Sequence, residues 1–349
     1  MDINKLLRKH LINMKPYSSA RDEYTGKEGV FLDANENPFG SASKEAFNRY
    51  PDPLQKELKQ KLSQIKGVPA KNIFLGNGSD EPIDLLIRAF CEPEKDEVVI
   101  TPPTYGMYQV CAEVNNAKLI SVPLTVDFDL DVEGILSAIS ENSKIIFLCS
   151  PNNPTGNSLQ NSDVINVLEN FPGIVVIDEA YIDFAEHDSY ATLLSKYKNL
   201  VVLQTLSKAW GLAALRLGMA FADDQIISIL TKIKYPYNIN AATQKLVLEA
   251  LDNENWKNDQ VSEILALRDE LIEKIQSFSQ VEKVYPSDAN FVLVKIRDAK
   301  KIFDYLIDQK IIVRDRSKVI LCEDCLRITV GTKSENNSLI DALSNYLNK

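Results

Sequence analysis

Between about residue 70 and residue 222, the chain alternates short apolar runs with stretches of helical spacing. The runs are rich in β-branched side chains and apolar on both faces: EVVIT (97–101), KLISV (118–122), KIIFLC (144–149), GIVVID (173–178), LVVLQT (200–205) and LGMAFA (217–222). Helical spacing recurs between them in LLIRAF (85–90), YGMYQVCAEV (105–114) and VEGILSAI (132–139). Runs of this kind are typical of strands that helices cover on both sides. The alternation therefore predicts an α/β fold with a mostly parallel sheet between layers of helices.

The texture of the sequence changes after about residue 240. Helical patterns lie at 241–251, 258–277 and 299–309, and strand patterns lie at 289–296, 311–315 and 326–331. A final helix follows the last strand. This order predicts a smaller α+β domain with its own sheet. We expect a large domain over residues 41–244. We group the N-terminal segment 1–40, which has no strand–helix pattern of its own, with a small domain over residues 245–349.

Composition excludes several classes of function. The chain has 349 residues, of which 45% are hydrophobic, and its formal net charge is −10. That balance argues against a nucleic-acid partner, which requires a basic face. The N-terminus has no apolar signal region and no apolar run is long enough to span a membrane, so we expect a cytoplasmic protein without a membrane partner.

Histidine and cysteine usage limits the chemistry. The only histidines are His10 and His187, so a Ser-His-Asp mechanism is not expected. The five cysteines are an odd number in a long chain, which is not the pattern of a disulfide framework. Cys322 and Cys325 form half of a redox or zinc motif, but the sequence holds no second pair, and we expect no metal.

Unusual residues gather where the predicted strands end. The segments are GNGSDE (76–81), PPTYGMY (102–108), SPNNPTG (150–156), DEAY (178–181) and TLSKAWGLAALRLG (205–218). Ligands of open α/β sheets bind beyond the carboxyl ends of the strands. We therefore expect these five segments to form one ligand-binding crevice.

Two charged residues at those strand ends point to a specific chemistry. A lysine amine with a pKa of about 10.4 is neutral in only about one molecule in 2,500 at pH 7, so a nucleophilic Lys208 needs burial or a neighbouring positive charge. Asp178 ends an apolar strand and needs a cationic partner, which a protonated pyridine nitrogen would supply. Taken alone, Lys208 could also be a solvated lysine at the start of an apolar helix, AWGLAAL. Asp178 could equally be the capping residue of a helix or loop.

The same crevice offers groups for a phosphate. GNGSDE supplies a flexible backbone and Ser79 at a helix start, so that free N–H groups face an anion. The hydroxyls of Thr205 and Ser207 and a bidentate Arg216 suit the same phosphate. Tyr105 follows two prolines and could stack on a flat cofactor, or simply pack.

The combination of SPNNPTG, DEAY and SKAWGLAALRLG, in this order and spacing, resembles the fold-type I pyridoxal-phosphate enzymes. Within that superfamily, the chain is most similar to the histidinol-phosphate aminotransferases. The further segments that carry this likeness are LDANENPFG (32–40), RYPDP (49–53), SDANF (287–291), VRD (313–315) and LRITVGT (326–332). The resemblance covers nearly the whole chain. It departs where Trp210 stands for the usual Phe and Ala214 for the usual Gly.

The resemblance implies a role for each residue around the cofactor, pyridoxal 5'-phosphate. Lys208 matches the Schiff-base lysine that carries the proton between substrate and cofactor. Asp178 matches the partner of the pyridine nitrogen, Asn153 and Tyr181 the partners of the ring hydroxyl oxygen, and Tyr105 the residue stacked on the ring. The phosphate contacts are Gly78, Ser79, Asp80, Thr205, Ser207, Arg216 and, from a neighbouring subunit, Tyr50. A homodimer with shared active sites follows from the position of Tyr50.

On the substrate side, the resemblance implies that Arg314 and Arg327 hold a phosphate, with Tyr17 and Asn35 as further contacts. The implied reaction passes an amino group between L-histidinol phosphate and 2-oxoglutarate, giving imidazole acetol phosphate and L-glutamate in L-histidine biosynthesis. Arg316 matches no functional position of the family.

Three alternatives stay open on the sequence alone. Aromatic amino acid aminotransferases and threonine-phosphate decarboxylase share most of these motifs, and an arginine pair for a phosphate suits the decarboxylase too. Some transcription regulators carry this fold as a sensing domain. They need an N-terminal DNA-binding region, whereas here the domain begins within about 40 residues at a net charge of −10.

Overall fold

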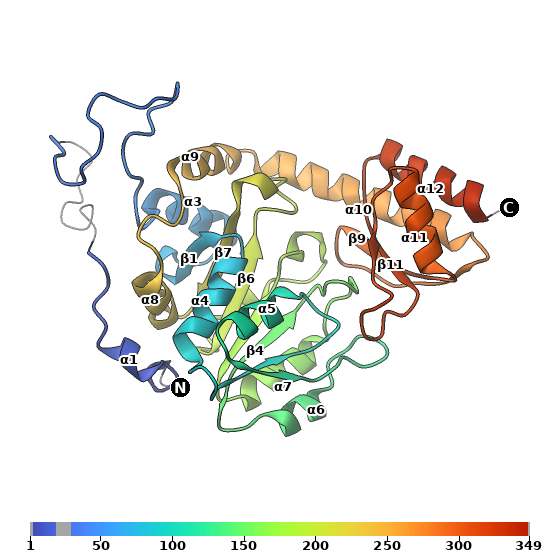
Figure 1. The fold of residues 1–349 in the computed structure, drawn as a ribbon, viewed down its shortest axis with the longest axis horizontal. Coiled ribbons are helices and arrows are strands. Elements are labelled where there is room, and N and C mark those ends of the chain that lie inside the picture. The colour runs from blue at the N-terminus through green and yellow to red at the C-terminus, as the bar shows by residue number, and fades with distance from the viewer. Residues whose placement is uncertain (1–2, 19–28, 348–349) are drawn as a thin grey trace.

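The computed structural model describes residues 3–18 and 29–347, and a seven-stranded sheet runs through the centre of this part of the chain (Figure 1). Its strand order is β1-β7-β6-β5-β4-β2-β3. All neighbours from β6 to β3 pair in parallel, whereas β7 is antiparallel to both β1 and β6. The strands are β1 (Ile73–Asn77), β2 (Glu97–Ile100), β3 (Lys118–Ser121), β4 (Ser143–Cys149), β5 (Ile174–Asp178), β6 (Leu200–Thr205) and β7 (Leu217–Ala222).

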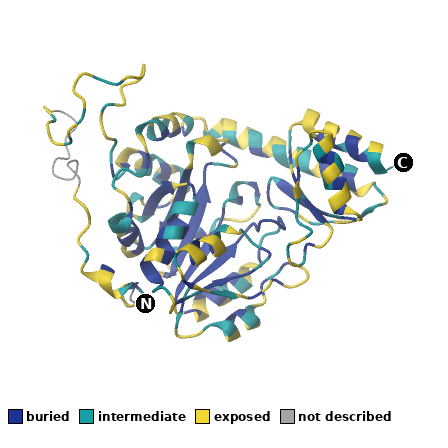
Figure 2. Cartoon of the chain, viewed as in Figure 1, coloured by how far each residue is buried: buried dark blue, intermediate teal, exposed yellow. Residues whose placement is uncertain are grey.

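Helices cover both faces of this sheet because its strands are apolar on both sides. Along β4, Ile145 and Phe147 face one core cluster, whereas Ile146 and Leu148 face the other. The first cluster lies under α4 (Asp80–Phe90), α5 (Met107–Val114) and α8 (Asp224–Ile233). The second lies under α3 (Lys56–Lys66), α6 (Val132–Ala138) and α7 (Asn161–Asn170). Figure 2 shows the strands buried between these partly exposed helices.

A second, four-stranded antiparallel sheet forms at the other end of the molecule, in the order β10-β11-β9-β8. Its strands are β8 (Val281–Val284), β9 (Phe291–Ile296), β10 (Arg314–Asp315) and β11 (Cys325–Thr329). One face of β9 and β11 forms a separate core with α10 (Glu254–Gln276), α11 (Ala299–Asp308) and α12 (Lys333–Leu347). On the other face, Leu293 and Cys325 pack against the core of the large sheet. The predicted combination of a mostly parallel sheet and a smaller α+β unit is confirmed.

The division into domains that the sequence suggested stays a prediction. Its boundary at 244–245 falls inside α9 (Ala241–Ala250), where Val247 packs in the core of the large sheet. Leu7 and Leu11, near α1 (Lys9–Ile12), also pack on the large sheet, in the cluster under α4. Residues 1–2 and 19–28 of the expected N-terminal segment, and 348–349 of the small domain, lie outside the described residues.

All six strands that the sequence predicted between residues 97 and 222 are confirmed, with bounds that agree to within a residue. The helix predicted directly after Lys208 is wrong. The chain there makes a turn and then a short 3₁₀ helix, Ala213–Leu215. Gly211 at φ +65° and Arg216 at φ +52° have left-handed backbone conformations, which an α-helix does not accommodate.

Short 3₁₀ helices complete the described chain, at Ile3–Lys5, Ala70–Asn72, Ile182–Phe184 and Tyr190–Leu193. Among the described helices, none combines the length and apolar character needed to cross a membrane.

Candidate active site

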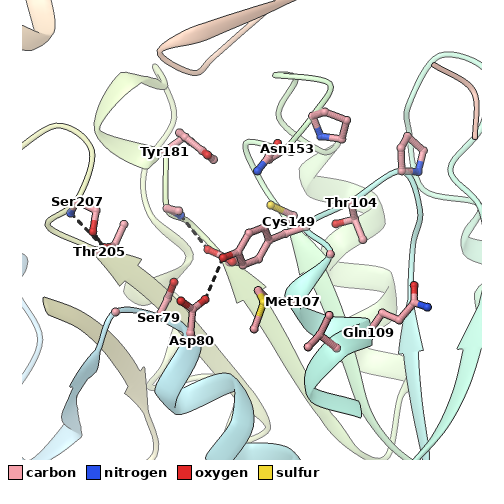
Figure 3. A pocket seen from close by; sticks show the side chains of 18 of the residues that line it. Ser79, Asp80, Thr104, Met107, Gln109, Cys149, Asn153, Tyr181, Thr205 and Ser207 are labelled. Carbon is pink, nitrogen blue, oxygen red and sulfur yellow. Dashed lines mark hydrogen bonds between the residues drawn. The ribbon is translucent and has the colours of Figure 1, made fainter. Parts of the chain in front are cut away.

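A cavity of about 820 Å³ opens where β1, β2, β4, β5 and β6 end. All five segments that the sequence singled out contribute to its lining, and the small sheet closes it with three arginines. Figure 3 shows Ser79 and Asp80 at the start of α4, with Asn153 and Tyr181 reaching the same space from two other segments. The predicted residues that line it are Gly78, Ser79, Asp80, Tyr105, Asn153, Asp178, Tyr181, Thr205, Ser207, Lys208, Arg216, Arg314 and Arg327.

Lys208 lies in the turn that follows β6. The backbone of this turn is closed by hydrogen bonds from Gly211 N to Lys208 O (3.0 Å) and from Leu212 N to Leu206 O (3.0 Å). The ammonium lies 5.5 Å from the ring centre of Tyr181. Although Lys208 is open to the cavity, protein surrounds much of its side chain. Burial, and then the charge of Arg327, lower the pKa of its amine below the ordinary lysine value, as a nucleophilic lysine requires.

Asp178 ends β5 and is almost fully buried. The phenol of Tyr108 donates a hydrogen bond to Oδ2 (2.7 Å), and Ala180 N donates to Oδ1 (3.1 Å). Burial raises the pKa of this carboxyl to about 6, while the bond from Tyr108 opposes the rise. A carboxylate in this position would be stabilised by a cation held in the cavity.

The turn between β1 and α4 forms an anion site. Gly78 has φ +70°, and its N–H donates to Arg216 O (2.7 Å). Ser79 is the N-cap residue of α4, and its side chain makes no capping hydrogen bond. The N–H groups of the first helical turn have no intrahelical partners, and they favour negative charge.

Backbone contact fixes this turn against β7. A Cβ atom on Gly218 would lie 2.2 Å from the carbonyl carbon of Gly78 and 2.3 Å from Ser79 N. Real Cβ contacts are never this short, so the close approach depends on glycine at position 218.

Side chains at and just after the end of β6, and just before β7, complete the anion site. Arg216 Nη1 donates to Ser207 Oγ at 3.5 Å, and Thr205 Oγ1 donates to Ser207 Oγ at 3.0 Å. Asp80 Oδ2 is 3.4 Å from Arg216 Nη2, and Asp80 Oδ1 accepts a bond from Tyr105 (3.0 Å). Arg216 thus offsets the charge of Asp80 through one of its nitrogens, and backbone N–H groups, hydroxyls and the rest of the guanidinium remain to meet an anion.

Two arginines approach from the small sheet. Arg314 of β10 lies directly opposite Arg327 of β11, and opposite residues of antiparallel strands share a face. Arg327 Nη1 donates to Asn153 Oδ1 at 2.5 Å, and its guanidinium lies 5.2 Å from the ring centre of Phe291. Among the described residues, neither arginine has a carboxylate within ion-pair distance. The two guanidiniums are therefore available to an anionic ligand.

Three predicted residues do not line this cavity. Tyr17 and Tyr50 line a separate hollow of about 700 Å³, and Asn35 lies with Tyr50 in another of about 640 Å³. Tyr50 stacks on Tyr237, with ring centres 4.4 Å apart. Their assigned contacts stay predictions, because a single chain does not bring them to Lys208.

Sequence reasoning missed Tyr108 and assigned no role to Arg316. Tyr108 was visible as a residue one helical turn after Tyr105 in PPTYGMY. Its ring stacks on Phe147, with centres 4.7 Å apart, and this contact aims its hydroxyl at Asp178. Asn152 was also missed. It joins the loops after β2 and β4 by donating to Pro103 O (2.8 Å).

The residues present fit pyridoxal phosphate. Its phosphate matches the turn before α4 and Arg216, its ring nitrogen matches the buried carboxylate of Asp178, and its ring hydroxyl matches Asn153 and Tyr181. Asp178 gives the strongest test, because its burial disfavours the charged form unless a cation is bound nearby.

Comparison with known proteins agrees with this geometry. Residues 24–343 match the family model of the class I and II aminotransferases. The chain belongs to this family. Among curated class I and II aminotransferases, the histidinol-phosphate aminotransferase of Cytophaga hutchinsonii is 58% identical over 344 residues, 99% of each chain. That of Parabacteroides distasonis is 55% identical over 347 residues, again 99% of each.

A solved structure adds a comparison in three dimensions. The histidinol-phosphate aminotransferase of Sinorhizobium meliloti, determined in complex with pyridoxal-5'-phosphate, is 26% identical and has a TM-score of 0.80. The match covers 90% of each chain.

Proposed function

We propose that this aminotransferase is a histidinol-phosphate aminotransferase that uses pyridoxal 5'-phosphate. It passes an amino group between L-histidinol phosphate and 2-oxoglutarate, giving imidazole acetol phosphate and L-glutamate in L-histidine biosynthesis. The observation that carries the proposal is the facing pair Arg314 and Arg327 in the cavity of Lys208. Full-length similarity to relatives of that name supports it.

Bound pyridoxal phosphate supplies an electron sink and stores the amino group between the two half-reactions. The chain's own residues bind and orient it and move the proton. Lys208 would hold the cofactor and, as a partly buried amine with a lowered pKa, would carry the proton from the substrate α-carbon to the cofactor. Asp178 keeps the ring nitrogen protonated, because a buried carboxylate stabilises a cation beside it.

Arg314 and Arg327 hold the phosphate of the substrate. Histidinol phosphate has no carboxylate, so the arginine pair meets a phosphate in one half-reaction and a carboxylate of glutamate in the other. A guanidinium suits both, because its N–H groups bind phosphate and carboxylate oxygens bidentately.

A homodimer in the cytoplasm belongs to the same proposal. Large apolar side chains are exposed on the segment before Tyr50, with Phe39 98% and Leu32 87% exposed. An exposed apolar surface of this kind favours a protein partner. We propose that a second copy of the chain covers this apolar surface, and that its active site receives Tyr50, Tyr17 and Asn35. The five cysteines are free thiols, as is usual in a reducing compartment.

Mixed dimers test the shared site. A dimer of Lys208→Ala with Tyr50→Ala has one cavity that keeps both native residues if Tyr50 acts across the interface. Co-refolded variants should then gain activity above either parent. No gain would contradict a shared active site.

The activity test is glutamate formation from L-histidinol phosphate and 2-oxoglutarate, compared with L-phenylalanine and L-tyrosine as amino donors. We expect the highest kcat/KM for histidinol phosphate. A higher value for an aromatic amino acid would identify an aromatic aminotransferase instead. Carbon dioxide released from threonine phosphate without any 2-oxo acid would identify the decarboxylase.

A further inference from the structure

Arg316 lines the active-site cavity beside Arg314 and Arg327. Its N–H donates to Cys325 O (2.9 Å), so the backbone after β10 continues to follow β11. Residues two apart on an extended strand share a face. Arg316 therefore shares the face of Arg314, whereas Asp315 points to the other side and accepts a hydrogen bond from Ser317 N (2.9 Å).

The guanidinium of Arg316 lacks partners within the described chain. It donates no hydrogen bond there, and its Nε atom is buried without an acceptor. No carboxylate of a described residue lies within ion-pair distance of it. A buried N–H without an acceptor costs free energy. An anion in the cavity would supply the hydrogen-bond acceptor and the negative charge that Arg316 lacks.

Arg314 and Arg327 are like charges near Arg316, and the opposite charge of Asp315 offsets part of their effect. Burial lowers the pKa of the Arg316 guanidinium, and the neighbouring Arg314 lowers it further. Burial lowers the pKa of Arg327 most, and the charges of Arg316 and Arg314 lower it further. Three guanidiniums thus gather at one end of the cavity. Their mutual repulsion is relieved most by a ligand that carries more than one negative charge.

We propose that Arg316 is a third guanidinium for the substrate phosphate and makes the site select a phosphate monoester over carboxylate substrates. The inference rests on the proposed function for the identity of the substrate. A phosphate monoester carries close to two negative charges at pH 7 and three acceptor oxygens, whereas a carboxylate carries one charge and two oxygens. Arg314 and Arg327 satisfy a carboxylate, so the third cation matters chiefly for the phosphate.

Arg316 could instead act through Tyr181, since burial raises the pKa of that phenol and the charges of Arg327 and then Arg316 oppose the rise. The two roles have different kinetic consequences. Loss of a phosphate contact raises KM for the phosphorylated substrate alone, whereas a changed Tyr181 lowers kcat with every substrate and shifts the absorbance of the bound cofactor.

The experiment compares the wild-type holoenzyme with Arg316→Gln, Arg316→Lys and a control, Lys318→Gln. Lys318 is exposed, lies two residues further along the same segment and is not part of the cavity lining. The control therefore removes one positive charge from the same region. For each protein we would measure KM and kcat for histidinol phosphate and for glutamate, and the absorbance of the bound cofactor. Calorimetry would give the Kd of inorganic phosphate.

We expect Arg316→Gln to raise KM for histidinol phosphate about tenfold to a hundredfold, the range of a charge-assisted hydrogen bond. KM for glutamate and the cofactor absorbance should stay close to wild type. Inorganic phosphate should bind more weakly to Arg316→Gln, and Arg316→Lys should recover part of the loss. Lys318→Gln should behave as wild type.

An equal rise in KM for both substrates, a fall in kcat alone, or the same loss in Lys318→Gln would overturn the inference. The binding measurement separates it from the proposed function. If histidinol phosphate is not turned over but inorganic phosphate binds more weakly to Arg316→Gln, the phosphate site stands and the named substrate is wrong. If turnover is as proposed and phosphate binds all variants equally, the inference alone fails.

Discussion

The phenol of Tyr108 donates a 2.7 Å hydrogen bond to Oδ2 of Asp178, and both residues are buried beneath the cavity. The bond stabilises the charged form of the carboxyl against burial. Tyr108 therefore acts as a positioning residue for Asp178, the carboxyl that we propose meets the cofactor nitrogen.

Tyr108→Phe removes this hydrogen bond with little change in volume. We expect the pKa of Asp178 to rise, the ring nitrogen to be held less firmly in its protonated form, and kcat to fall about tenfold, as for one net hydrogen bond to a charged group. A pH titration of the cofactor absorbance should shift as well. Tyr197→Phe is the matched control, since Tyr197 donates to Glu169 (2.6 Å) outside the cavity lining. An unchanged titration would contradict this role.

The apoenzyme should become less stable as the pH rises from about 4 to about 6. Burial raises the pKa of Asp178 to about 6 in the folded protein, above its value in the unfolded chain. The folded state then binds more protons in this window, so stability is greatest below the unfolded pKa and is lost as the pH rises through the folded one. A shift of about two pKa units corresponds to roughly 3 kcal/mol.

Urea unfolding at several pH values measures this dependence. The loss of unfolding free energy with rising pH should be smaller in apo Asp178→Asn. The remaining loss should extend toward pH 7, because burial raises the pKa of Glu179 to about 7. Identical pH profiles for the two proteins would argue against a raised pKa at Asp178.

Arg216→Ala should weaken binding of pyridoxal phosphate to the apoenzyme about tenfold to a hundredfold, because it removes a charged donor to the phosphate and leaves Asp80 unpaired. Fluorescence titration of the apoenzyme measures the Kd. Lys71→Ala breaks an exposed ion pair with Asp224 and serves as the control. If Arg216→Ala bound pyridoxal phosphate as tightly as wild type does, the cofactor phosphate would not lie at Arg216.

Gly218→Ala tests the close approach of β7 to the turn before α4. The added Cβ would lie 2.2 Å from backbone carbon, so the turn must move. We expect a loss of about 1–3 kcal/mol in the free energy of unfolding, as for overpacking, together with weaker cofactor binding. Calorimetry and the cofactor titration measure both, and wild-type values in both would show that the turn adapts without cost.

The order of the strands and the place of the cavity were predictable, because buried parallel strands have a strong apolar pattern and their carboxyl ends meet at one edge. The turn after Lys208 was not. AWGLAAL has the composition of a helix, and nothing local shows that Gly211 and Arg216 adopt left-handed conformations. The strand β10 is two residues long in the structure, against a predicted run at 311–315. It pairs only with Leu326 and Arg327, although β11 continues to Thr329.

The contact of Tyr108 with Asp178 spans 70 residues, and the guanidinium of Arg316 lacks an acceptor because no described neighbour supplies one. Neither follows from local pattern. The roles of the residues around Lys208 were assigned by resemblance, and the structure brings most of them to one cavity. Tyr17, Asn35 and Tyr50 line other hollows of the chain, and their contacts with the site stay predictions.

A single-turnover experiment tests the central claim most directly. Holoenzyme is mixed with L-histidinol phosphate without any 2-oxo acid, and the ketone product is quantified. We predict about one equivalent of imidazole acetol phosphate per subunit, no carbon dioxide, and renewed product formation when 2-oxoglutarate is added, because the amino group is stored between half-reactions. Absence of the ketone in active, cofactor-loaded enzyme, or continuous turnover without a 2-oxo acid, would contradict the proposed aminotransferase.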